Sequence, residues 1–305
     1  SLYSTKRMKE EAEAAGWNVR IIDPLKLSIV VDDDGGRLLH KGWPVDCDAV
    51  IPRIGHSITR RGVSVVRAFE RMGVIVLNKG DGIQSSRDKL LASQKMNEGG
   101  VPIPTTAQVG TWQDTRRAVS RVGGTPCVIK TNEGTHGSGV FLAHTEQQAR
   151  QLVYQMLERG LRPLVQEYIK ESHGQDIRAF VVGGKVVASM RRKAKGSEFR
   201  SNFHLGGEVE RLAISDEYAE IACEAAEILG LEIAGVDMLE SERGPLVLEV
   251  NSSPGLEGIE AASGVNVASR IISNLVSLHK SRQEAEEKQQ ISGSQSGEGE
   301  AKGNA

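Results

Sequence analysis

The chain has 305 residues, of which 39% are hydrophobic and 26% charged, and 38 Lys and Arg against 40 Asp and Glu leave a formal net charge of −2. A chain of this length buries about three quarters of its unfolded surface, so it needs neither disulfides nor a structural metal. The balanced charge argues against a direct nucleic-acid role. No apolar run approaches the roughly 18 residues of a membrane span, and no charged-then-apolar leader opens the chain. We therefore expect a cytoplasmic protein without a membrane role, with Cys47, Cys127 and Cys223 reduced.

The first eighty residues alternate short β-rich runs with helices, which is typical of an α/β lobe with a mostly parallel sheet. We predict helices over 2–15 and 59–72, and strands over 19–22, 28–31, 37–40, 49–52 and 74–77. Because a strand usually precedes such a helix–strand unit, we also expect that a first strand is missing before Ser1. Asp33-Asp34-Gly35-Gly36 is typical of a hairpin turn.

Two further lobes are predicted after a helix over 81–97 and an extended connector over 101–104. A helix over 113–121, strands over 127–131 and 140–144 and a helix over 146–157 indicate a small α+β lobe. The remaining strands, 164–169, 234–239 and 246–250, with a Gly183-Gly184 hairpin and a helix over 216–229, favour an antiparallel sheet. Gly, Ser, Gln and charged residues dominate after Ser281 and predict a disordered tail. The predicted domains are 1–80, 81–164, 165–281 and the tail 282–305.

A glycine-rich segment, Glu133-Gly-Thr-His-Gly-Ser-Gly139, lies between two predicted strands, the first of which contains Lys130. Its three glycines allow successive backbone N–H groups to approach an anion closely. It is not a Walker loop, because the Gly-Lys-Ser/Thr ending is absent and no helix follows. A hairpin loop without a ligand is the alternative. Lys130 favours a phosphate cradle, since a lysine there can place a point charge on phosphates.

The last two predicted strands carry acidic and amide side chains among apolar residues. Glu249 and Asn251 are two residues apart and so face the same side of a strand, where Asp237 could meet them from a neighbouring strand. Oxygen ligands suit Mg²⁺ or Mn²⁺ shared with nucleotide phosphates. A salt-bridged pair of strands is the alternative, because a buried carboxylate needs either a partner or a ligand.

A basic run begins at Arg191 and Arg192 and continues to Arg200-Ser-Asn202 and His204. A solvated basic loop is the usual explanation of such a run. Arginines are also needed to stabilise the charge that develops during phosphoryl transfer. Nucleic-acid binding is a weaker alternative, because few aromatic residues are interleaved with the charges.

Taken together, these motifs resemble the ATP-grasp superfamily of carboxylate–amine ligases. Three segments, Ile51-Pro-Arg-Ile-Gly55, Arg200-Ser-Asn-Phe-His204 and Glu249-Val-Asn-Ser-Ser-Pro-Gly-Leu-Glu-Gly258, resemble more closely its RimK family, which adds glutamate to the C-terminus of small-subunit ribosomal protein six. The resemblance covers about residues 1–280. It implies an α/β (α+β) ATP-grasp fold: a Rossmann-like pre-ATP-grasp lobe, a small α+β central lobe and a C-terminal antiparallel-sheet lobe.

The resemblance also implies a role for each matching residue. Lys89 and Lys130 would contact the phosphates of ATP, under a loop containing Gly134, Gly137 and Gly139. Glu167 and Tyr168 would lie beside the adenine, Asp176 would bind the ribose, and Arg200, Ser201 and Asn202 would reach the phosphate end. Asp237, Glu249 and Asn251 would hold two Mg²⁺ or Mn²⁺ ions. Arg178, Arg191 and Arg200 would be catalytic, with Arg53, Arg192 and His204 as further candidates for binding carboxylate substrates.

The implied reaction activates a carboxylate with ATP as an acyl phosphate, which the α-amine of free glutamate then attacks, and repeated addition gives poly-α-glutamate. The implied partners are ribosomal protein six as the acceptor and identical subunits in a tetramer. Two alternatives stay open: a related ligase with a small-molecule amino-acid acceptor, and a nucleotide-sensing module without catalysis. The full set of Asp237, Glu249 and Asn251 argues against the second alternative, since a binder has less use for it.

Overall fold

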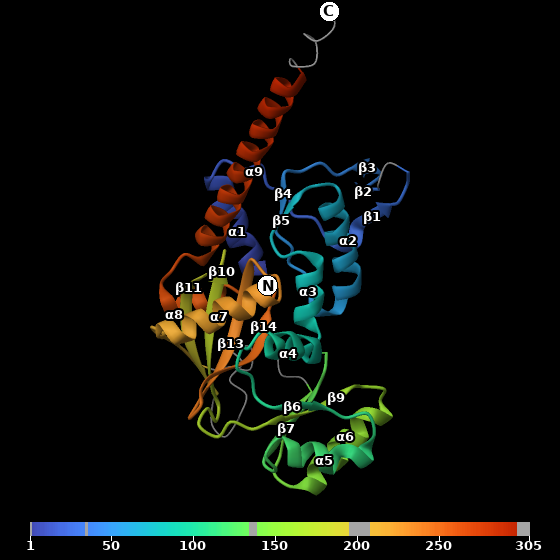
Figure 1. Ribbon diagram of the computed structural model, residues 1–305, viewed down its shortest axis with the longest axis vertical. Helices are drawn as coiled ribbons and strands as arrows, with labels where there is room; N and C mark the ends of the chain where they lie inside the picture. The colour runs from blue at the N-terminus through green and yellow to red at the C-terminus, as the bar shows by residue number, and fades with distance from the viewer. Residues whose placement is uncertain (1, 34–35, 134–138, 195–207, 298–305) are drawn as a thin grey trace, which may run out of the picture.

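The computed structural model describes residues 2–33, 36–133, 139–194 and 208–297, whose strands form four sheets. Figure 1 shows three regions: an N-terminal region in blue, a central lobe built around β6, β7 and β9, and a C-terminal sheet covered by α7 and α8. The α/β (α+β) fold expected from the sequence is confirmed. The candidate site residues lie on elements of all three regions.

The N-terminal region contains one antiparallel sheet and one parallel pair of strands. The antiparallel sheet has the order β1-β2-β3, and β4 pairs in parallel with β5. Its elements are α1 (Leu2–Ala14), η1 (Pro24–Lys26), β1 (Leu27–Val30), β2 (Arg37–His40), β3 (Trp43–Pro44), β4 (Ala49–Val50), η2 (His56–Ile58), α2 (Thr59–Arg71) and β5 (Ile75–Val76). The expectation of a mostly parallel sheet is therefore wrong for the described residues.

The strand predicted over residues 19–22 is also wrong, because these residues have no regular structure. A strand exists only when its backbone groups pair with a neighbour, and apolar alternation alone does not provide that partner. Ile21 is 61% exposed, so this run does not enter the core. The predicted hairpin connects β1 to β2, although Asp34 and Gly35 lie outside the described residues.

The helix predicted over residues 81–97 is divided into α3 (Gly80–Arg87) and α4 (Lys89–Glu98). Asp88, between them, has an extended backbone, and its carboxylate accepts a hydrogen bond of 3.0 Å from the backbone N–H of Leu91. This is an N-cap, which satisfies a donor that the first turn of a helix leaves unpaired. The break places Arg87 and Lys89 beside the C-terminal sheet.

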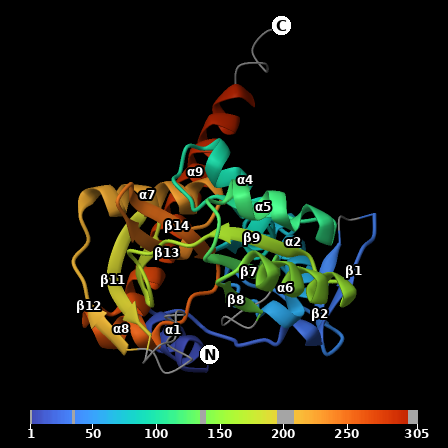
Figure 2. The same ribbon diagram turned by 90° about the horizontal axis from the view of Figure 1, so that it is seen from below.

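The central lobe is a four-stranded antiparallel sheet in the order β6-β9-β7-β8. Helices α5 and α6 cover one face of it, as Figure 2 shows from below. Cys127 and Ile129 face these helices, so Lys130 faces the opposite side of the sheet. The elements are β6 (Thr106–Gln108), η3 (Trp112–Asp114), α5 (Thr115–Arg121), β7 (Cys127–Thr131), β8 (Val140–Ala143), α6 (Glu146–Glu158) and β9 (Pro163–Glu167).

The C-terminal sheet is antiparallel, as expected, with the order β12-β11-β10-β13-β14. One face packs on α7 through residues such as Ile177 and Met238, and half of the other face packs on α8 and α9 through Phe180. The other half of that second face carries the charged side chains of the site. The elements are β10 (Gln175–Val182), β11 (Lys185–Lys193), β12 (Glu208–Arg211), α7 (Asp216–Ile228), β13 (Ile233–Ser241), β14 (Gly244–Asn251) and α8 (Glu257–Ser263).

The last helix, α9 (Val267–Gly297), continues well past Ser281. The expectation of a disordered tail from residue 282 is therefore wrong up to residue 297, and residues 298–305 lie outside the described part. Glu, Lys, Arg, Gln and Ala are good helix formers, and Arg282 forms an i,i+4 ion pair of 2.7 Å with Glu286. Among the described helices, none combines the length and the apolar character needed to cross a lipid bilayer.

Candidate active site

The predicted phosphate and metal residues come together where α4, the central lobe and the C-terminal sheet meet. Arg178, Asp237 and Glu249 are direct partners across β10, β13 and β14, so they form one row on the sheet. Asn251 follows two residues after Glu249 on β14 and faces the same side. The charges of Lys89 and Glu249 both act on Lys130. The structure thus brings together six of the residues that the sequence singles out.

Lys130 is a buried lysine, 6% exposed, on the face of the central sheet opposite α5 and α6. Its ammonium donates a 2.9 Å hydrogen bond to the side-chain carbonyl oxygen of Gln166. In the described part of the chain no carboxylate lies within ion-pair distance of it. Burial, and to a lesser degree the charge of the nearby Lys89, lower the pKa of Lys130 to about 8 against the opposing charge of Glu249. A buried ammonium without a counter-charge is suited to an anionic ligand.

Lys89 is held near Lys130 by a link between the end of β7 and the start of α4. Asn132 accepts a 2.8 Å hydrogen bond from the backbone N–H of Leu90 and donates one of 2.9 Å to Asp88. Asn132 is 1% exposed, so these bonds are shielded from water. The position of Lys89 therefore follows from the N-cap of α4 and from a buried amide.

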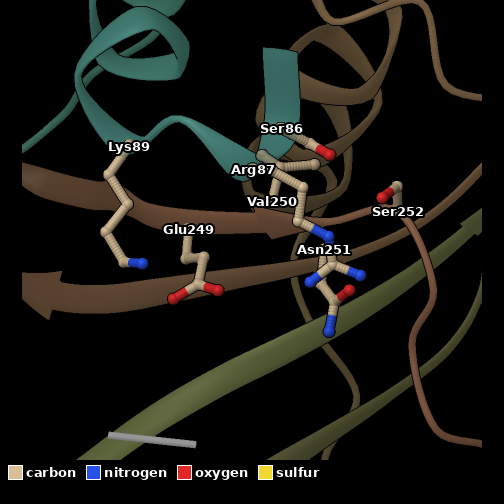
Figure 3. A pocket seen from close by; sticks show the side chains of 7 residues that line it. All are labelled: Ser86, Arg87, Lys89, Glu249, Val250, Asn251 and Ser252. Atoms are coloured by element: carbon tan, nitrogen blue, oxygen red, sulfur yellow. The ribbon is translucent and has the colours of Figure 1, made fainter. Parts of the chain in front are cut away.

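A small pocket opens beside these residues, and Figure 3 shows the side chains of Lys89 and Glu249 running in the same direction on one side of it. Arg87 and Asn251 line its other side. Ser86, Val250 and Ser252 complete the lining. The lining combines two cations with a carboxylate, an amide and hydroxyls, which is a donor and acceptor set suited to an anionic ligand and an oxygen-liganded cation.

Asp237 lies in a buried network of alternating charges. Arg178 donates two hydrogen bonds to it, of 2.6 and 2.7 Å, and Arg192 approaches the same carboxylate to 2.8 Å. Arg192 also donates two bonds of 2.6 Å to Asp176. Burial alone would raise the pKa of Asp237, but the two guanidiniums outweigh it and lower the pKa below its usual value.

The residues present fit a divalent cation on oxygen ligands. Glu249 takes part in no ion pair in the described part of the chain, and Asn251 uses its carbonyl oxygen only to accept a 3.0 Å bond from the N–H of Ser253. Each oxygen has a second lone pair available. Within the described ranges no three His, Cys, Asp or Glu side chains form a cluster, so the cation ligands would be two carboxylates and an amide.

Arg191 requires a correction, because the structure does not bring it to this site. Its neighbour Arg192 faces the site, so Arg191 points to the opposite face of the sheet, toward α7. There it forms ion pairs with Glu240 and with Glu210. We therefore remove Arg191 from the candidate catalytic residues.

The residues predicted near the base and the sugar lie at the edge of the site. Glu167, the last residue of β9, accepts hydrogen bonds from the backbone of Thr105 at 3.0 Å and from Arg243 at 2.6 Å. Burial would raise the pKa of Glu167, but the bond from Arg243 lowers it. Tyr168 contacts His173. The predicted ribose ligand, Asp176, is buried against Arg192.

Several predicted residues lie outside the described ranges: Gly134, Gly137, Arg200, Ser201, Asn202 and His204. Gly139 is described, and its φ of +80° is a conformation that only glycine adopts readily. A Cβ atom at this position would lie 3.2 Å from the side chain of Thr131. Glycine at 139 is therefore required by the backbone itself.

Arg87 and Ser252 also line the pocket, although the sequence motifs predict no role for either residue. Arg87 donates a 2.8 Å bond to the carbonyl of Ile54, and Arg53 donates one of 2.8 Å to the carbonyl of Pro254. Burial and the charge of Arg87 lower the pKa of Arg53 to about 10. The position of Arg87 two residues before Lys89 was the one sequence feature that could have indicated a role for it. Its spatial neighbours come from distant segments of the chain, so the sequence did not reveal them.

Solved structures of ATP-grasp ligases share the arrangement of the central and C-terminal sheets. The ATP-grasp ligase PsnB complexed with minimal precursor is 19% identical with a TM-score of 0.70, covering 90% of this chain and 94% of that one. A RimK domain ATP-grasp protein from Sphaerobacter thermophilus is 20% identical with a TM-score of 0.68, covering 89% and 94%. The fold that this chain shares with these structures is the ATP-grasp fold.

The family follows from sequence comparison. The chain matches the RimK-like ATP-grasp domain over residues 86–275 and the RimK PreATP-grasp domain over residues 1–83. A "Probable alpha-L-glutamate ligase" of Aeromonas salmonicida is 47% identical over 271 residues, covering 88% of this chain and 91% of that protein. One of Legionella pneumophila is 48% identical over 273 residues, covering 89% and 90%. The chain belongs to the RimK-like ATP-grasp family.

Proposed function

We propose that this protein is an α-L-glutamate ligase that uses ATP to add glutamate to the C-terminal carboxylate of small-subunit ribosomal protein six. Relatives that are 47–48% identical over nearly their whole length are named as probable α-L-glutamate ligases. Repeated addition to the new C-terminus makes poly-α-glutamate. The observation that carries the proposal is the buried Lys130 beside Lys89 and Glu249, which forms a site for a nucleotide phosphate next to a candidate cation ligand.

A carboxylate is a poor electrophile at neutral pH, so it must first be activated. The acceptor carboxylate attacks the terminal phosphorus of ATP, which forms an acyl phosphate and releases ADP. The α-amine of glutamate then attacks the acyl carbon. The C–N bond forms, the C–O bond to phosphate breaks, and the amine loses a proton to solvent.

Lys130 and Lys89 neutralise charge on the phosphates during this transfer. Lys130 is fixed by Gln166 at 2.9 Å and buried, so its charge needs no rearrangement when the transition state forms. Exclusion of water from such a site also protects the acyl phosphate from hydrolysis. Glu167, Tyr168 and Asp176 are proposed to bind the nucleoside, and Arg178 to hold Asp237 in position.

Asp237, Glu249 and Asn251 are proposed to hold Mg²⁺ or Mn²⁺, which, when bound, neutralises charge on the phosphates. Glu249 suits this role because it carries no ion pair in the described residues and lines the pocket. The two hydrogen bonds from Arg178 fix the position of the Asp237 carboxylate at one edge of the site.

The test is intact-mass analysis of ribosomal protein six after incubation with the protein, ATP, Mg²⁺ and glutamate. We expect a ladder of glutamyl additions. An acceptor with an amidated C-terminus should give none, since it has no carboxylate to activate. The isosteric variant Glu249→Gln should also give none, while its melting temperature stays close to that of the wild type. Unchanged acceptor mass with the wild-type protein would refute the proposed acceptor.

A related ligase with a small-molecule amino-acid acceptor is the second candidate, which the sequence motifs leave open. It would be favoured if glutamate stimulated the release of ADP without modifying ribosomal protein six. Screening of amino acids and short peptides as acceptors would then identify the substrate.

A further inference from the structure

Two arginines from different segments meet beside the pocket without a carboxylate partner. Arg53 follows β4, and Arg87 is the last residue of α3. The charge of Arg87 acts directly on Arg53. Among the described residues neither guanidinium forms an ion pair, and each is hydrogen-bonded only to a backbone carbonyl, that of Pro254 or Ile54, at 2.8 Å.

Three side-chain polar atoms are buried and unpaired in the described structure. They are Nε of Arg87 and the hydroxyl oxygens of Ser252 and Ser253. Ser252 is 2% exposed and lines the pocket with Arg87. A buried donor without an acceptor is costly, so two such groups lining one pocket, Arg87 and Ser252, with a third on the adjacent Ser253, indicate an absent ligand that accepts hydrogen bonds.

The turn that carries the two serines is held firmly in position. The side chain of Asn78 donates a 2.7 Å bond to the carbonyl of Ser252, and Asn251 accepts one of 3.0 Å from the N–H of Ser253. Arg53 fixes the carbonyl of Pro254, two residues further on. The hydroxyls are thus presented by a rigid backbone, and rigid presentation lowers the entropic cost of binding.

The nearest acid, Glu249, does not satisfy these groups. It raises the pKa of Arg87 through its charge, but no ion pair joins the two residues. The proposed function also assigns Glu249 to the cation. The nucleotide phosphates already have Lys89 and Lys130. Two guanidiniums with two hydroxyls instead match a planar carboxylate, to which arginine donates paired hydrogen bonds.

We propose that Arg53, Arg87, Ser252 and Ser253 form a carboxylate-binding subsite that orients the incoming amino acid for attack on the acyl phosphate. The identity of that amino acid as glutamate rests on the proposed function. The subsite borders the pocket of Lys89 and Glu249, because Arg87 and Ser252 line both. A carboxylate held there leaves the α-amine of the same molecule within reach of the activated acceptor.

The test compares Arg87→Lys and Ser252→Ala with the wild type in three measurements: KM for glutamate, KM for ATP, and calorimetric binding of glutamate. Loss of a charge-assisted hydrogen bond should raise KM and Kd for glutamate about tenfold or more in Arg87→Lys, and about fivefold in Ser252→Ala. KM for ATP should stay within about twofold. The control is Ser263→Ala, far along α8, whose buried hydroxyl already donates to the carbonyl of Ile259 at 2.6 Å.

Melting temperature separates binding from stability. Because the hydroxyl of Ser252 has no hydrogen-bond partner among the described residues, Ser252→Ala should keep or raise the melting temperature, whereas Ser263→Ala should lower it without changing KM for glutamate. Glutamine and the α-amide of glutamate then identify which carboxylate is bound. In one of these two analogues, wild type and Arg87→Lys should bind with equal affinity. The carboxylate that this analogue carries as an amide is the one that occupies the subsite.

Each outcome decides the proposal. Unchanged glutamate binding in both variants overturns it, and so does a rise in KM for ATP instead of glutamate, because the cluster would then bind phosphate. Weakened glutamate binding in the variants, in a protein that transfers no glutamate to ribosomal protein six, supports the subsite while refuting the proposed acceptor. A wild-type protein that binds no glutamate overturns both.

Discussion

Arg178 and Asp237 lie opposite each other on β10 and β13, and the guanidinium of Arg178 donates hydrogen bonds of 2.6 and 2.7 Å to the Asp237 carboxylate. Glu249 is the next residue in the same row, on β14, but takes part in no ion pair in the described chain. Asp237 therefore has a structural role that Glu249 lacks, although both are proposed cation ligands.

We predict that Asp237→Asn lowers the free energy of unfolding by about 3 to 5 kcal/mol, because it leaves Arg178 and Arg192 short of a buried counter-charge. Glu249→Gln should change it by less than about 1 kcal/mol. Urea unfolding without nucleotide measures both values. Equal losses in the two variants would contradict the structural difference between these carboxylates.

Lys130→Met should stabilise the nucleotide-free protein at pH 7, because it removes a buried ammonium without a carboxylate partner. The pKa of Lys130 is lowered from about 10.5 to about 8, which corresponds to a cost on the order of 3 kcal/mol. The variant should also lose nucleotide binding. Its matched control is Lys95→Met, whose ammonium bonds to the hydroxyl of Ser85 at 3.0 Å, outside the site.

The gain from Lys130→Met should depend on pH in a defined direction. Below pH 8 the folded wild type carries the full cost of the buried charge. Between pH 8 and 10.5 the unfolded chain binds the proton more tightly, so wild-type stability rises with pH and the difference shrinks. Melting curves of both proteins from pH 7 to 10 measure this trend, and a constant difference would exclude Lys130 as its source.

Asn78 joins the N-terminal region to the C-terminal sheet. Its side chain makes three buried hydrogen bonds of 2.7 to 2.8 Å, two with Ile233 and one with Ser252. Its φ is +70°, which asparagine tolerates better than alanine. Asn78→Ala should cost about 2 to 4 kcal/mol of stability. Asn78→Gly should cost about 1 kcal/mol less, since glycine removes the backbone strain; equal costs in urea unfolding would contradict this explanation.

Arg191→Met should leave kcat and both KM values within about twofold, since Arg191 lies on the face of the sheet away from the pocket. Its ion pairs with Glu240 and Glu210 are partly exposed, so the loss of stability should stay near 1 kcal/mol. Steady-state kinetics test this expectation. A large fall in kcat would restore Arg191 to the active site.

Much of the local structure and part of the site could be predicted from the sequence. The strand period of two placed Glu249 and Asn251 on one face, and Lys130 on the face opposite Ile129. The order of helices and strands predicted the antiparallel C-terminal sheet. The expectations of a strand over residues 19–22, of one unbroken helix over 81–97 and of disorder over 282–297 were wrong, because pairing partners, capping and helix propagation depend on context.

The amino-acid sequence by itself determined the family motifs and the side chains that share a face of one strand, because these depend only on spacing along the chain. The tertiary structure alone decided that Arg192 and not Arg191 meets Asp237, since this depends on how β10, β11 and β13 are paired. It also decided that Arg53 and Arg87 lie beside the turn after β14. Distances between segments far apart in the chain arise from packing, which no local pattern records.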